Sequence, residues 1–319
     1  MKNKYIFGPI HSRRLGRSLG VDLVTAKCCS ENCIYCEAGE TTELTCRRRE
    51  YVPVDEVIAE LRAFLSAAPA IDWITFSGSG EPTLNSRFGD VAAFIKREFP
   101  QYRLCLLTNG WGLGDPALQQ EIRWCDLVVP SLDASDAAEF QTINRPVAEL
   151  QFDDFIRGLE SFCRTTAATV WIELFLVPGI NDSEESLARF AAILRRLPAA
   201  KLQLNALDRP GVADWLRVPE EAVMRHFADV LGAIMPVEIV GPCRQAAGVR
   251  TVLDCRICGI AAERPVTPAE LRAALQEEDE RVLQQRVAAL VRQGVLQREA
   301  GEPERYFCAA VNREISEHE

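Results

Sequence analysis

Residues 73–98, with the sequence WITFSGSGEPTLNSRFGDVAAFIKRE, contain the pattern that decides the fold. The run begins with four residues of high β propensity, Trp73 to Phe76, and continues through a turn of small residues that ends at Pro82. Apolar residues then recur at the spacing of an amphipathic helix between Arg87 and Glu98. A strand, a turn and a helix in this order form one unit of a parallel α/β fold.

The same unit recurs on both sides of this stretch, because short β-rich runs alternate with amphipathic stretches over most of the chain. Six units predict a partial, TIM-like (β/α)6 barrel, open on one side, with its functional residues on the loops that follow the strands. The expected strands are Gly20–Val24, Trp73–Phe76, Arg103–Thr108, Leu127–Leu132, Thr169–Val177 and Lys201–Ala206. The expected helices are Pro53–Ala67, Arg87–Glu98, Asp115–Arg123, Phe152–Arg164 and Ser183–Leu197.

The pattern changes at about Pro265. One helix is expected from Thr267, a second over Arg281–Gln293, and the alternating residues after Gly294 predict a β-hairpin. Two helices and a hairpin of this size resemble a winged helix. The sequence thus predicts a barrel over residues 1–207, an extension over 208–264 and a small winged-helix-like module over 265–319.

The composition predicts a folded protein with a sizeable core, since 48% of the 319 residues are hydrophobic and 26% are charged. No apolar run approaches the roughly 20 residues of a spanning helix, and the N-terminal residues lack the apolar stretch of a signal peptide. We therefore expect no membrane partner and a cytoplasmic location. The net charge of −10 disfavours a surface that wraps nucleic acid, whereas the local charge of +5 over residues 1–27 indicates either an anion-facing patch or a solvated surface.

Twelve cysteines in a chain expected in a reducing compartment indicate metal ligands where they cluster. The first set follows the first expected strand at CxxxCxxC spacing: Cys29, Cys33 and Cys36. The second set lies in the extension: Cys243, Cys255 and Cys258. Three thiolates can ligate three irons of a 4Fe–4S cluster and leave the fourth iron open. A structural zinc ion is the alternative, which at the first set would recruit Cys28 or Cys46 as a fourth ligand.

The motif Cys29-Ser-Glu-Asn-Cys33-Ile-Tyr35-Cys36 resembles the cluster-binding motif of the radical SAM superfamily, which has an aromatic residue before its third cysteine. The turn Ser77-Gly-Ser-Gly-Glu-Pro82 is similar to the glycine-rich element of the same superfamily. The resemblance implies an enzyme that binds a 4Fe–4S cluster through these cysteines and S-adenosylmethionine (SAM) at the open iron. One electron would cleave SAM to a 5′-deoxyadenosyl radical, which abstracts a hydrogen atom from a substrate inside the barrel.

The resemblance also implies where SAM binds. Small residues let backbone carbonyls approach the ammonium of the methionine moiety, and polar side chains at two further strand ends reach the ribose and the carboxylate. A plain strand-to-helix turn is the alternative for the glycine-rich element. The expected cofactor-binding residues are Tyr35, Ser77, Gly78, Ser79, Gly80, Glu81, Thr108, Asn109, Ser131 and Asp133.

Residues 7–22, 51–57 and 143–146 narrow the resemblance to a branch related to the tRNA wyosine-forming enzymes. The likeness covers about residues 5–210 and implies a flavodoxin or ferredoxin-type electron donor. Wyosine chemistry itself is not expected, because Cys28 is the only cysteine ahead of the motif, where the wyosine enzyme has ligands of a second cluster. A compact small molecule or a peptide is the expected substrate, with tRNA as the alternative.

Two other residues are catalytic candidates. Glu173 is polar within an apolar strand, so it either faces the barrel interior or satisfies a buried partner. Arg145 is a candidate for binding a substrate carboxylate or phosphate, with a surface ion pair as the alternative.

The second cysteine set predicts an auxiliary 4Fe–4S cluster, by analogy with radical SAM enzymes of molybdopterin biosynthesis. A rival function is a redox-sensing regulator whose winged helix reads DNA. The net charge of −4 over residues 265–319 argues against a DNA partner, because phosphate contacts need clustered positive charge.

Overall fold

The computed structural model describes residues 4–12, 14–24, 27–207, 211–240, 257–258, 260–261, 266–275, 280–292, 295–299 and 305–308. Its centre is an eight-stranded sheet with the strand order β1-β2-β5-β6-β7-β8-β9-β10. Only β1 is antiparallel to its neighbour, and every other pair in the sheet is parallel. The strands are β1 (Ile6–Ser12), β2 (Gly16–Val21), β5 (Trp73–Phe76), β6 (Arg103–Thr108), β7 (Leu127–Pro130), β8 (Thr169–Phe175), β9 (Lys201–Asn205) and β10 (Val237–Ile239).

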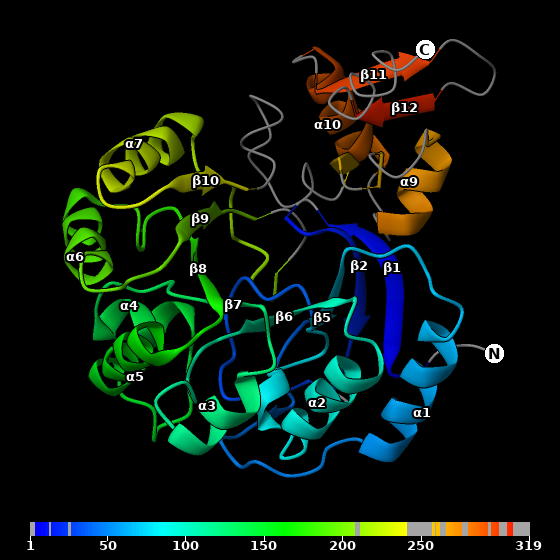
Figure 1. Cartoon of the computed structure of the whole chain (residues 1–319). Helices are drawn as coiled ribbons and strands as arrows, with labels where there is room; N and C mark the ends of the chain where they lie inside the picture. The colour runs from blue at the N-terminus through cyan, green and yellow to red at the C-terminus, as the bar shows by residue number, and fades with distance from the viewer. Residues whose placement is uncertain are drawn as a thin grey trace.

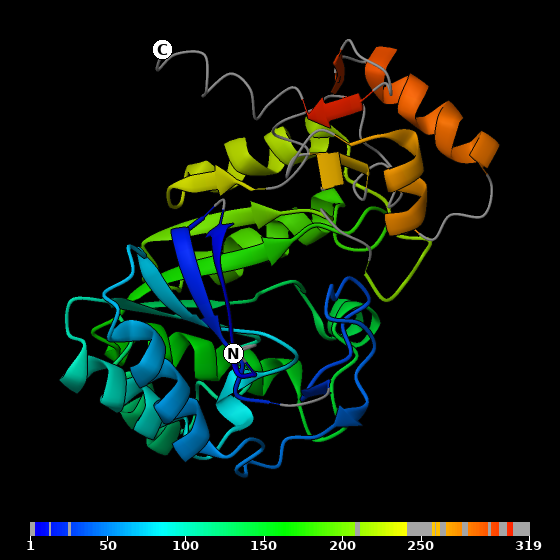
Figure 2. The same ribbon diagram turned by 90° about the vertical axis from the view of Figure 1, so that its right-hand side faces the viewer.

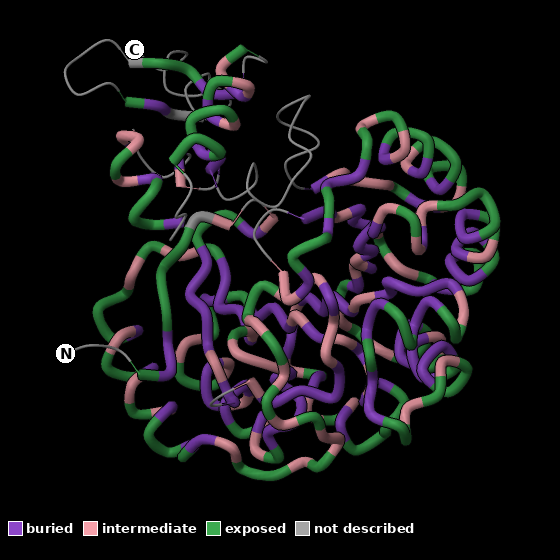
Figure 3. The backbone as a smooth tube through the Cα atoms, turned by 180° about the vertical axis from the view of Figure 1, so that it is seen from behind, coloured by how far each residue is buried: buried purple, intermediate pink, exposed green. Residues whose placement is uncertain are grey.

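Helices cover the outer face of this sheet, and the buried residues concentrate between the two (Figures 1 and 3). Alternate strand residues such as Ile74, Phe76 and Leu104 belong to the large core that these helices share, as the period of two in a strand requires. The helices are α1 (Val54–Leu65), the short 3-10 helix η1 (Pro82–Leu84), α2 (Phe88–Glu98), α3 (Pro116–Ile122), α4 (Ala137–Ile143), α5 (Phe152–Thr165), α6 (Glu184–Leu194) and α7 (Glu221–Gly232).

The other strand residues face inwards. Trp73, Cys105, Leu127 and Val129 form a separate apolar cluster with Leu15 from the turn before β2. Polar residues also occupy this face. Among them are Ser18 and Thr75, whose hydroxyl groups lie 2.6 Å apart. The inner face of the sheet therefore has an apolar part, formed by this cluster, and a polar part.

The C-terminal elements are α9 (Pro268–Leu275), α10 (Glu280–Arg292), β11 (Leu296–Glu299) and β12 (Arg305–Cys308). Thr267 and Glu270 form a capping box at the start of α9, with Oγ1 of Thr267 accepting from the Glu270 N–H at 3.2 Å. These elements lie on the far side of the molecule from α2 and α3 (Figures 1 and 2). They are two helices and a hairpin in the predicted order, while the winged-helix likeness stays a prediction.

The predicted partial barrel is confirmed: the six expected strands lie side by side in sequence order as β2, β5, β6, β7, β8 and β9. Two strands that were not expected extend the sheet. They are β1 at one edge and β10, which follows α7, at the other. The first expected strand, predicted over Gly20–Val24, is β2, which begins at Gly16 and ends at Val21 because it pairs with β1 over this length. No helix within the described ranges is long and apolar enough to span a membrane.

Candidate functional site

The three cysteines of the first set lie on a loop at the carboxyl end of β2. The loop begins with β3 (Cys28–Cys29), which pairs with β4 (Glu43–Leu44). It then runs against the segment after α4, where the N–H of Ile34 donates to the carbonyl of Ile143 at 2.9 Å and that of Val147 to Ser30 at 3.0 Å. Residues 143–147 therefore act as the backbone support of the cysteine loop.

Each of the three cysteine sulfurs accepts a hydrogen bond from a different part of the chain. Asn109 Nδ2 lies 3.6 Å from Cys29 Sγ, and Asn144 Nδ2 lies 3.6 Å from Cys33 Sγ. Lys27 Nζ lies 2.9 Å from Cys36 Sγ.

The thiols of Cys28 and Cys33 also donate hydrogen bonds to carboxylates, Cys28 to Glu43 and Cys33 to Glu31, both at 3.3 Å. Cys28 therefore differs from the three motif cysteines in its place outside the CxxxCxxC spacing.

The three thiols fit the ligand set of a 4Fe–4S cluster, which takes each thiolate on a different iron. In the described part of the chain, no three histidine, cysteine, aspartate or glutamate side chains are grouped as ligands of a single metal ion. Burial raises the pKa of Cys29 to about 12 and that of Cys33 well above its usual value, so iron binding at these thiols must release protons.

The glycine-rich turn after β5 packs directly onto the cysteine loop. A Cβ on Gly80 would lie 1.8 Å from the carbonyl oxygen of Cys28, and the N–H of Glu81 donates to that oxygen at 3.1 Å. Gly78 has a φ of +143°, and a Cβ there would lie 2.4 Å from Cγ of Asp22. The turn therefore needs glycine at both positions, one for contact with the cysteine loop and one for contact with the end of β2.

The side chains of this turn are largely engaged by the protein. The N–H and Oγ of Ser79 donate to Asp22 at 2.9 and 2.5 Å. Glu81 is 2% exposed and accepts from Thr83, Thr108 and Asn109 at 2.6–3.0 Å. The other serine of the turn, Ser77, follows β5 and has a half-buried side chain. Glu81 thus links the turn to the end of β6.

Asp133, which follows β7, joins the cysteine loop to β8. Its carboxylate accepts from the Tyr35 hydroxyl, from Asn144 Nδ2 at 3.1 Å and from the Phe175 N–H at 2.9 Å. The Tyr35 ring stacks on Phe175 with centroids 4.1 Å apart. Burial raises the pKa of Asp133 to about 6.

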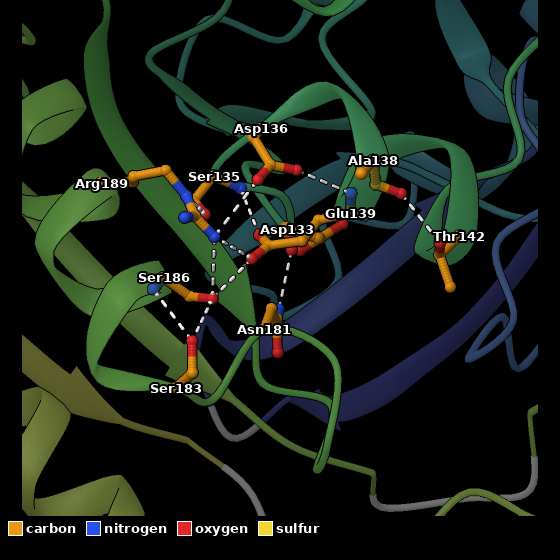
Figure 4. Close-up of polar contacts among 10 residues, drawn as sticks. All are labelled: Asp133, Ser135, Asp136, Ala138, Glu139, Thr142, Asn181, Ser183, Ser186 and Arg189. Atoms are coloured by element: carbon orange, nitrogen blue, oxygen red, sulfur yellow. Dashed lines mark hydrogen bonds and ion pairs between the residues drawn. The ribbon is translucent and has the colours of Figure 1, made fainter.

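A buried polar network lies beneath Asp133 (Figure 4). Asn181 Nδ2 donates to the carbonyls of Asp133 and Phe175 at 2.7 and 2.8 Å, and its Oδ1 accepts from the Val177 N–H at 2.7 Å. Nearby, Glu139 accepts from Ser186 and Arg189. The loops after β7 and β8 are therefore fixed to each other by side-chain contacts.

The family model of the radical SAM superfamily matches residues 23–191, which is more than half of the chain and includes the cysteine loop, the glycine-rich turn and Asp133. This chain belongs to the radical SAM superfamily. It is therefore an enzyme whose cofactors are a 4Fe–4S cluster and SAM.

Among its relatives, a UPF0026 protein from Synechocystis sp. is 32% identical over 206 residues, which cover 64% of this chain and 76% of the relative. A GTP 3′,8-cyclase from Edwardsiella ictaluri is 25% identical over 170 residues, 53% of this chain and 49% of the relative.

A protein named GTPase Obg from Brachyspira hyodysenteriae is 32% identical over 285 residues, which cover 88% of this chain but only 42% of that protein. No lysine of this chain follows a glycine, so the sequence has no GxxxxGK[ST] phosphate-binding loop. That relative's name is therefore not extended to this chain.

A solved radical SAM structure shares the fold. This methyltransferase from Sphaerobacter thermophilus superposes with a TM-score of 0.57 at 20% identity, covering 73% of this chain and 70% of the other. At this identity the likeness describes the fold alone. TYW1 with a lysine-pyruvate adduct gives a TM-score of 0.49 at 16% identity, over 69% and 74% of the two chains.

Glu173 and Arg145, the two catalytic candidates, differ in their surroundings within this radical SAM enzyme. Glu173 Oε1 accepts from Arg14 Nη1 at 2.7 Å and from Asn205 Nδ2 at 2.6 Å, on the inner face of the barrel. The Glu173 and Arg14 side chains are 16% and 20% exposed. Both alternatives for Glu173 therefore hold, since it lies inside the barrel and has partners there. Arg145 is exposed and follows Asn144 on the loop support.

The second cysteine set is not seen as a group. Cys243 and Cys255 lie outside the described residues, and Cys258 is 8% exposed. The auxiliary cluster of the radical SAM enzyme thus stays a prediction.

Sequence reasoning missed four residues around the motif: Asp22, Lys27, Glu31 and Asn144. Glu31 is 1% exposed, accepts from Cys33 at 3.3 Å and from Asn144 at 3.2 Å, and burial raises its pKa to about 8. The segment Ile143-Asn-Arg-Pro146 carries a likeness to relatives and the candidate Arg145 in the sequence, whereas its contact with the cysteine loop depends on the fold.

Proposed function

We propose that this enzyme binds its 4Fe–4S cluster through Cys29, Cys33 and Cys36, cleaves SAM reductively, and uses the product radical to remove a hydrogen atom from a compact substrate inside the barrel. The single observation that carries the ligand assignment is that these three sulfurs, which lie on one loop at CxxxCxxC spacing, each accept an N–H donor from a different part of the chain.

The cluster held by Cys29, Cys33 and Cys36 would supply one electron and a site for the methionine end of SAM. Cleavage of the bond between sulfur and C5′ would give methionine, and C5′ would take a hydrogen atom from the substrate to give 5′-deoxyadenosine. In this proposal a flavodoxin- or ferredoxin-type protein delivers the electron.

The proposed SAM site spans the carboxyl ends of β5, β6 and β7. Gly78, Gly80 and Ser77 bring the backbone of the turn close to the cofactor, and Ser131 offers a polar atom from the end of β7, while the Asn109 amide at the end of β6 is engaged by Ser30 and Trp111. Ser79, Glu81, Thr108, Asp133 and Tyr35 are engaged with protein partners, which supports a role in holding this backbone in place.

The proposed substrate is a small molecule or a peptide. The net charge of −10 supports this choice over tRNA, and the local charge of +5 over residues 1–27 supports an anionic group on the substrate. The name of the cyclase relative, which concerns GTP, is consistent with such a compact anion. Arg14, Glu173 and Asn205 would face the substrate from the barrel interior, and Arg145 would approach it from the loop support.

The proposed auxiliary 4Fe–4S cluster is bound by Cys243, Cys255 and Cys258 within the extension over 208–264, between the barrel over 1–207 and the module over 265–319. Replacing Cys29, Cys33 and Cys36 together with Ala should leave about one cluster's worth of iron. Zinc without iron in that variant would contradict the auxiliary cluster.

Reductive SAM cleavage is tested by anaerobic reconstitution with iron and sulfide, followed by dithionite and SAM. We expect 5′-deoxyadenosine and methionine in equal amounts from the wild type and from Cys28→Ala, and none from Cys29→Ala. Absence of both products from a wild-type protein with a loaded cluster would contradict the proposal and favour a redox-sensing regulator.

The substrate class is tested by adding extract from cells grown in heavy water and measuring deuterium in 5′-deoxyadenosine. We expect deuterium transfer from the low-molecular-weight fraction that survives ribonuclease. Transfer that ribonuclease abolishes would identify tRNA or another RNA as the substrate.

A further inference from the structure

The hydrogen bonds to the three motif sulfurs come from donors of different charge. Lys27 offers an ammonium group 2.9 Å from Cys36 Sγ, whereas Asn109 and Asn144 offer neutral amides 3.6 Å from Cys29 and Cys33. Charge-assisted hydrogen bonds are shorter and roughly twice as strong as neutral ones. Among the three donors, Lys27 therefore has the strongest electrostatic effect on the sulfurs.

Lys27 is anchored to β4 through its backbone. Its carbonyl oxygen accepts from the N–H groups of Thr42 and Glu43 at 2.9 and 3.1 Å, which joins its backbone to the start of β4. The side chain is only partly exposed, so solvent screens its charge less than at an open surface site. Its ammonium group is thus held next to Cys36 by the fold of the cysteine loop.

The two asparagines are also oriented by their other contacts. Asn109 Oδ1 accepts from the Trp111 N–H at 3.3 Å, and its Nδ2 donates to Ser30 Oγ at 2.8 Å as well as to Cys29. Asn144 Nδ2 also faces carboxylate oxygens of Glu31 and Asp133 at 3.2 and 3.1 Å, which favours this orientation of the amide, while its buried Oδ1 has no hydrogen-bond partner among the described residues. In both residues the N–H side therefore faces the sulfur.

Reduction of a cluster adds one negative charge close to its ligand sulfurs. Donors and positive charge at those sulfurs stabilise the reduced state more than the oxidised state, which raises the reduction potential. A carboxylate such as Glu31 acts in the opposite direction when ionised. The donors thus offset the negative groups buried around the motif.

We propose that Lys27, Asn109 and Asn144 raise the reduction potential of the cluster, and that Lys27 makes the largest contribution. These residues ligate no iron and position no substrate. They act through the sulfurs of Cys36, Cys29 and Cys33, so this inference rests on the proposed ligand assignment. Their function is to raise the reduction potential of the cluster to a value at which its electron donor can reduce it.

The test compares Lys27→Met with Lys27→Arg, which keeps the charge, and with Lys4→Met, which makes the same change in net charge at an exposed ion pair with Glu56. Iron per chain and the midpoint potential are measured for each by an anaerobic redox titration followed by EPR. The cysteines of the second set are replaced with Ala in all proteins, so that a single cluster is titrated.

We expect Lys27→Met to shift the ratio of reduced to oxidised cluster at least tenfold towards the oxidised form at a fixed potential, which is about 59 mV for one electron. Lys27→Arg should recover most of the shift, and Lys4→Met should match the parent protein. Asn109→Ala should shift the potential in the same direction by less. If Lys27→Met loads no iron, Asn109→Ala becomes the deciding variant.

An unchanged potential in a fully loaded Lys27→Met protein, or in Asn109→Ala where it decides, would overturn the inference. Failure of the ligand assignment is a separate result, because the parent protein would then give no cluster signal at all. The two outcomes are therefore distinguished by iron content and EPR of the parent protein alone.

Discussion

Gly80 is the residue at which the glycine-rich turn and the cysteine loop are in closest contact. We predict that Gly80→Ala forces the two apart, since its Cβ would lie 1.8 Å from the Cys28 carbonyl oxygen. Overpacking of this kind costs about 1–3 kcal/mol. Iron bound per chain after reconstitution should fall, and so should the free energy of unfolding. Gly232→Ala is the matched control, because no atom would lie within 4 Å of its Cβ. Equal iron content in the two variants would contradict the prediction.

Glu81 is the second residue with a clear expected effect. In Glu81→Gln one carboxylate oxygen is replaced by an NH2 group, which cannot accept a hydrogen bond. Depending on the orientation of the amide, either the N–H of Asn109 or the donors of Thr83 and Thr108 lose their acceptor. Leaving a buried donor without its acceptor costs about 1–3 kcal/mol. Denaturant unfolding of the apoprotein should show this loss, with the exposed Glu40→Gln as control. Identical midpoints for both variants would show that Glu81 does not anchor the turn.

The sequence was sufficient to predict the motif cysteines and the polar residues at the strand ends, because each is recognisable from its neighbours along the chain. It was not sufficient for Asn144, which is 111 positions from Cys33 and reaches it only through the fold. Lys27 is close in sequence, yet a lysine two residues before a motif carries no local signal of its contact with Cys36.

At the scale of elements, Asn181 fixes the loops after β7 and β8 to each other. We predict that Asn181→Ala costs about 3 kcal/mol or more, because it leaves two buried carbonyls and one buried N–H without a partner. Thr142→Ala removes one exposed hydrogen bond of the same region, to Ala138 at 2.8 Å, and should cost under about 0.5 kcal/mol (Figure 4). Hydrogen exchange should rise in both loops of Asn181→Ala only. Similar unfolding free energies for the two variants would refute this role.

Of the elements absent from the expected set, α7 has 12 residues and an amphipathic pattern, whereas β1, α4 and β10 have weak local patterns. β1 contains Gly8 and Pro9, which are depleted in strands, and its exposed edge position gives little alternation of apolar residues. α4 has 7 residues and β10 has 3, too few to show a period. The six central strands were predictable because each is a short apolar run followed by an amphipathic helix.

At the scale of the whole molecule, the charge distribution predicts that the C-terminal module does not read DNA. Residues 265–319 carry a net charge of −4 within a chain of −10. We expect no salt-dependent binding of duplex DNA by the full chain in fluorescence anisotropy. Sub-micromolar binding that weakens with salt would reverse this expectation and support a regulatory function.

The central claim is that Cys29, Cys33 and Cys36 hold a cluster whose open iron binds SAM. The most direct test is the EPR spectrum of the reduced protein before and after SAM is added, measured with Cys243, Cys255 and Cys258 replaced by Ala so that one cluster remains. We predict about four irons per chain, a cluster signal that changes shape on SAM addition, and no such signal when Cys29, Cys33 and Cys36 are also replaced. A fully loaded cluster whose spectrum is unchanged by saturating SAM would contradict the claim.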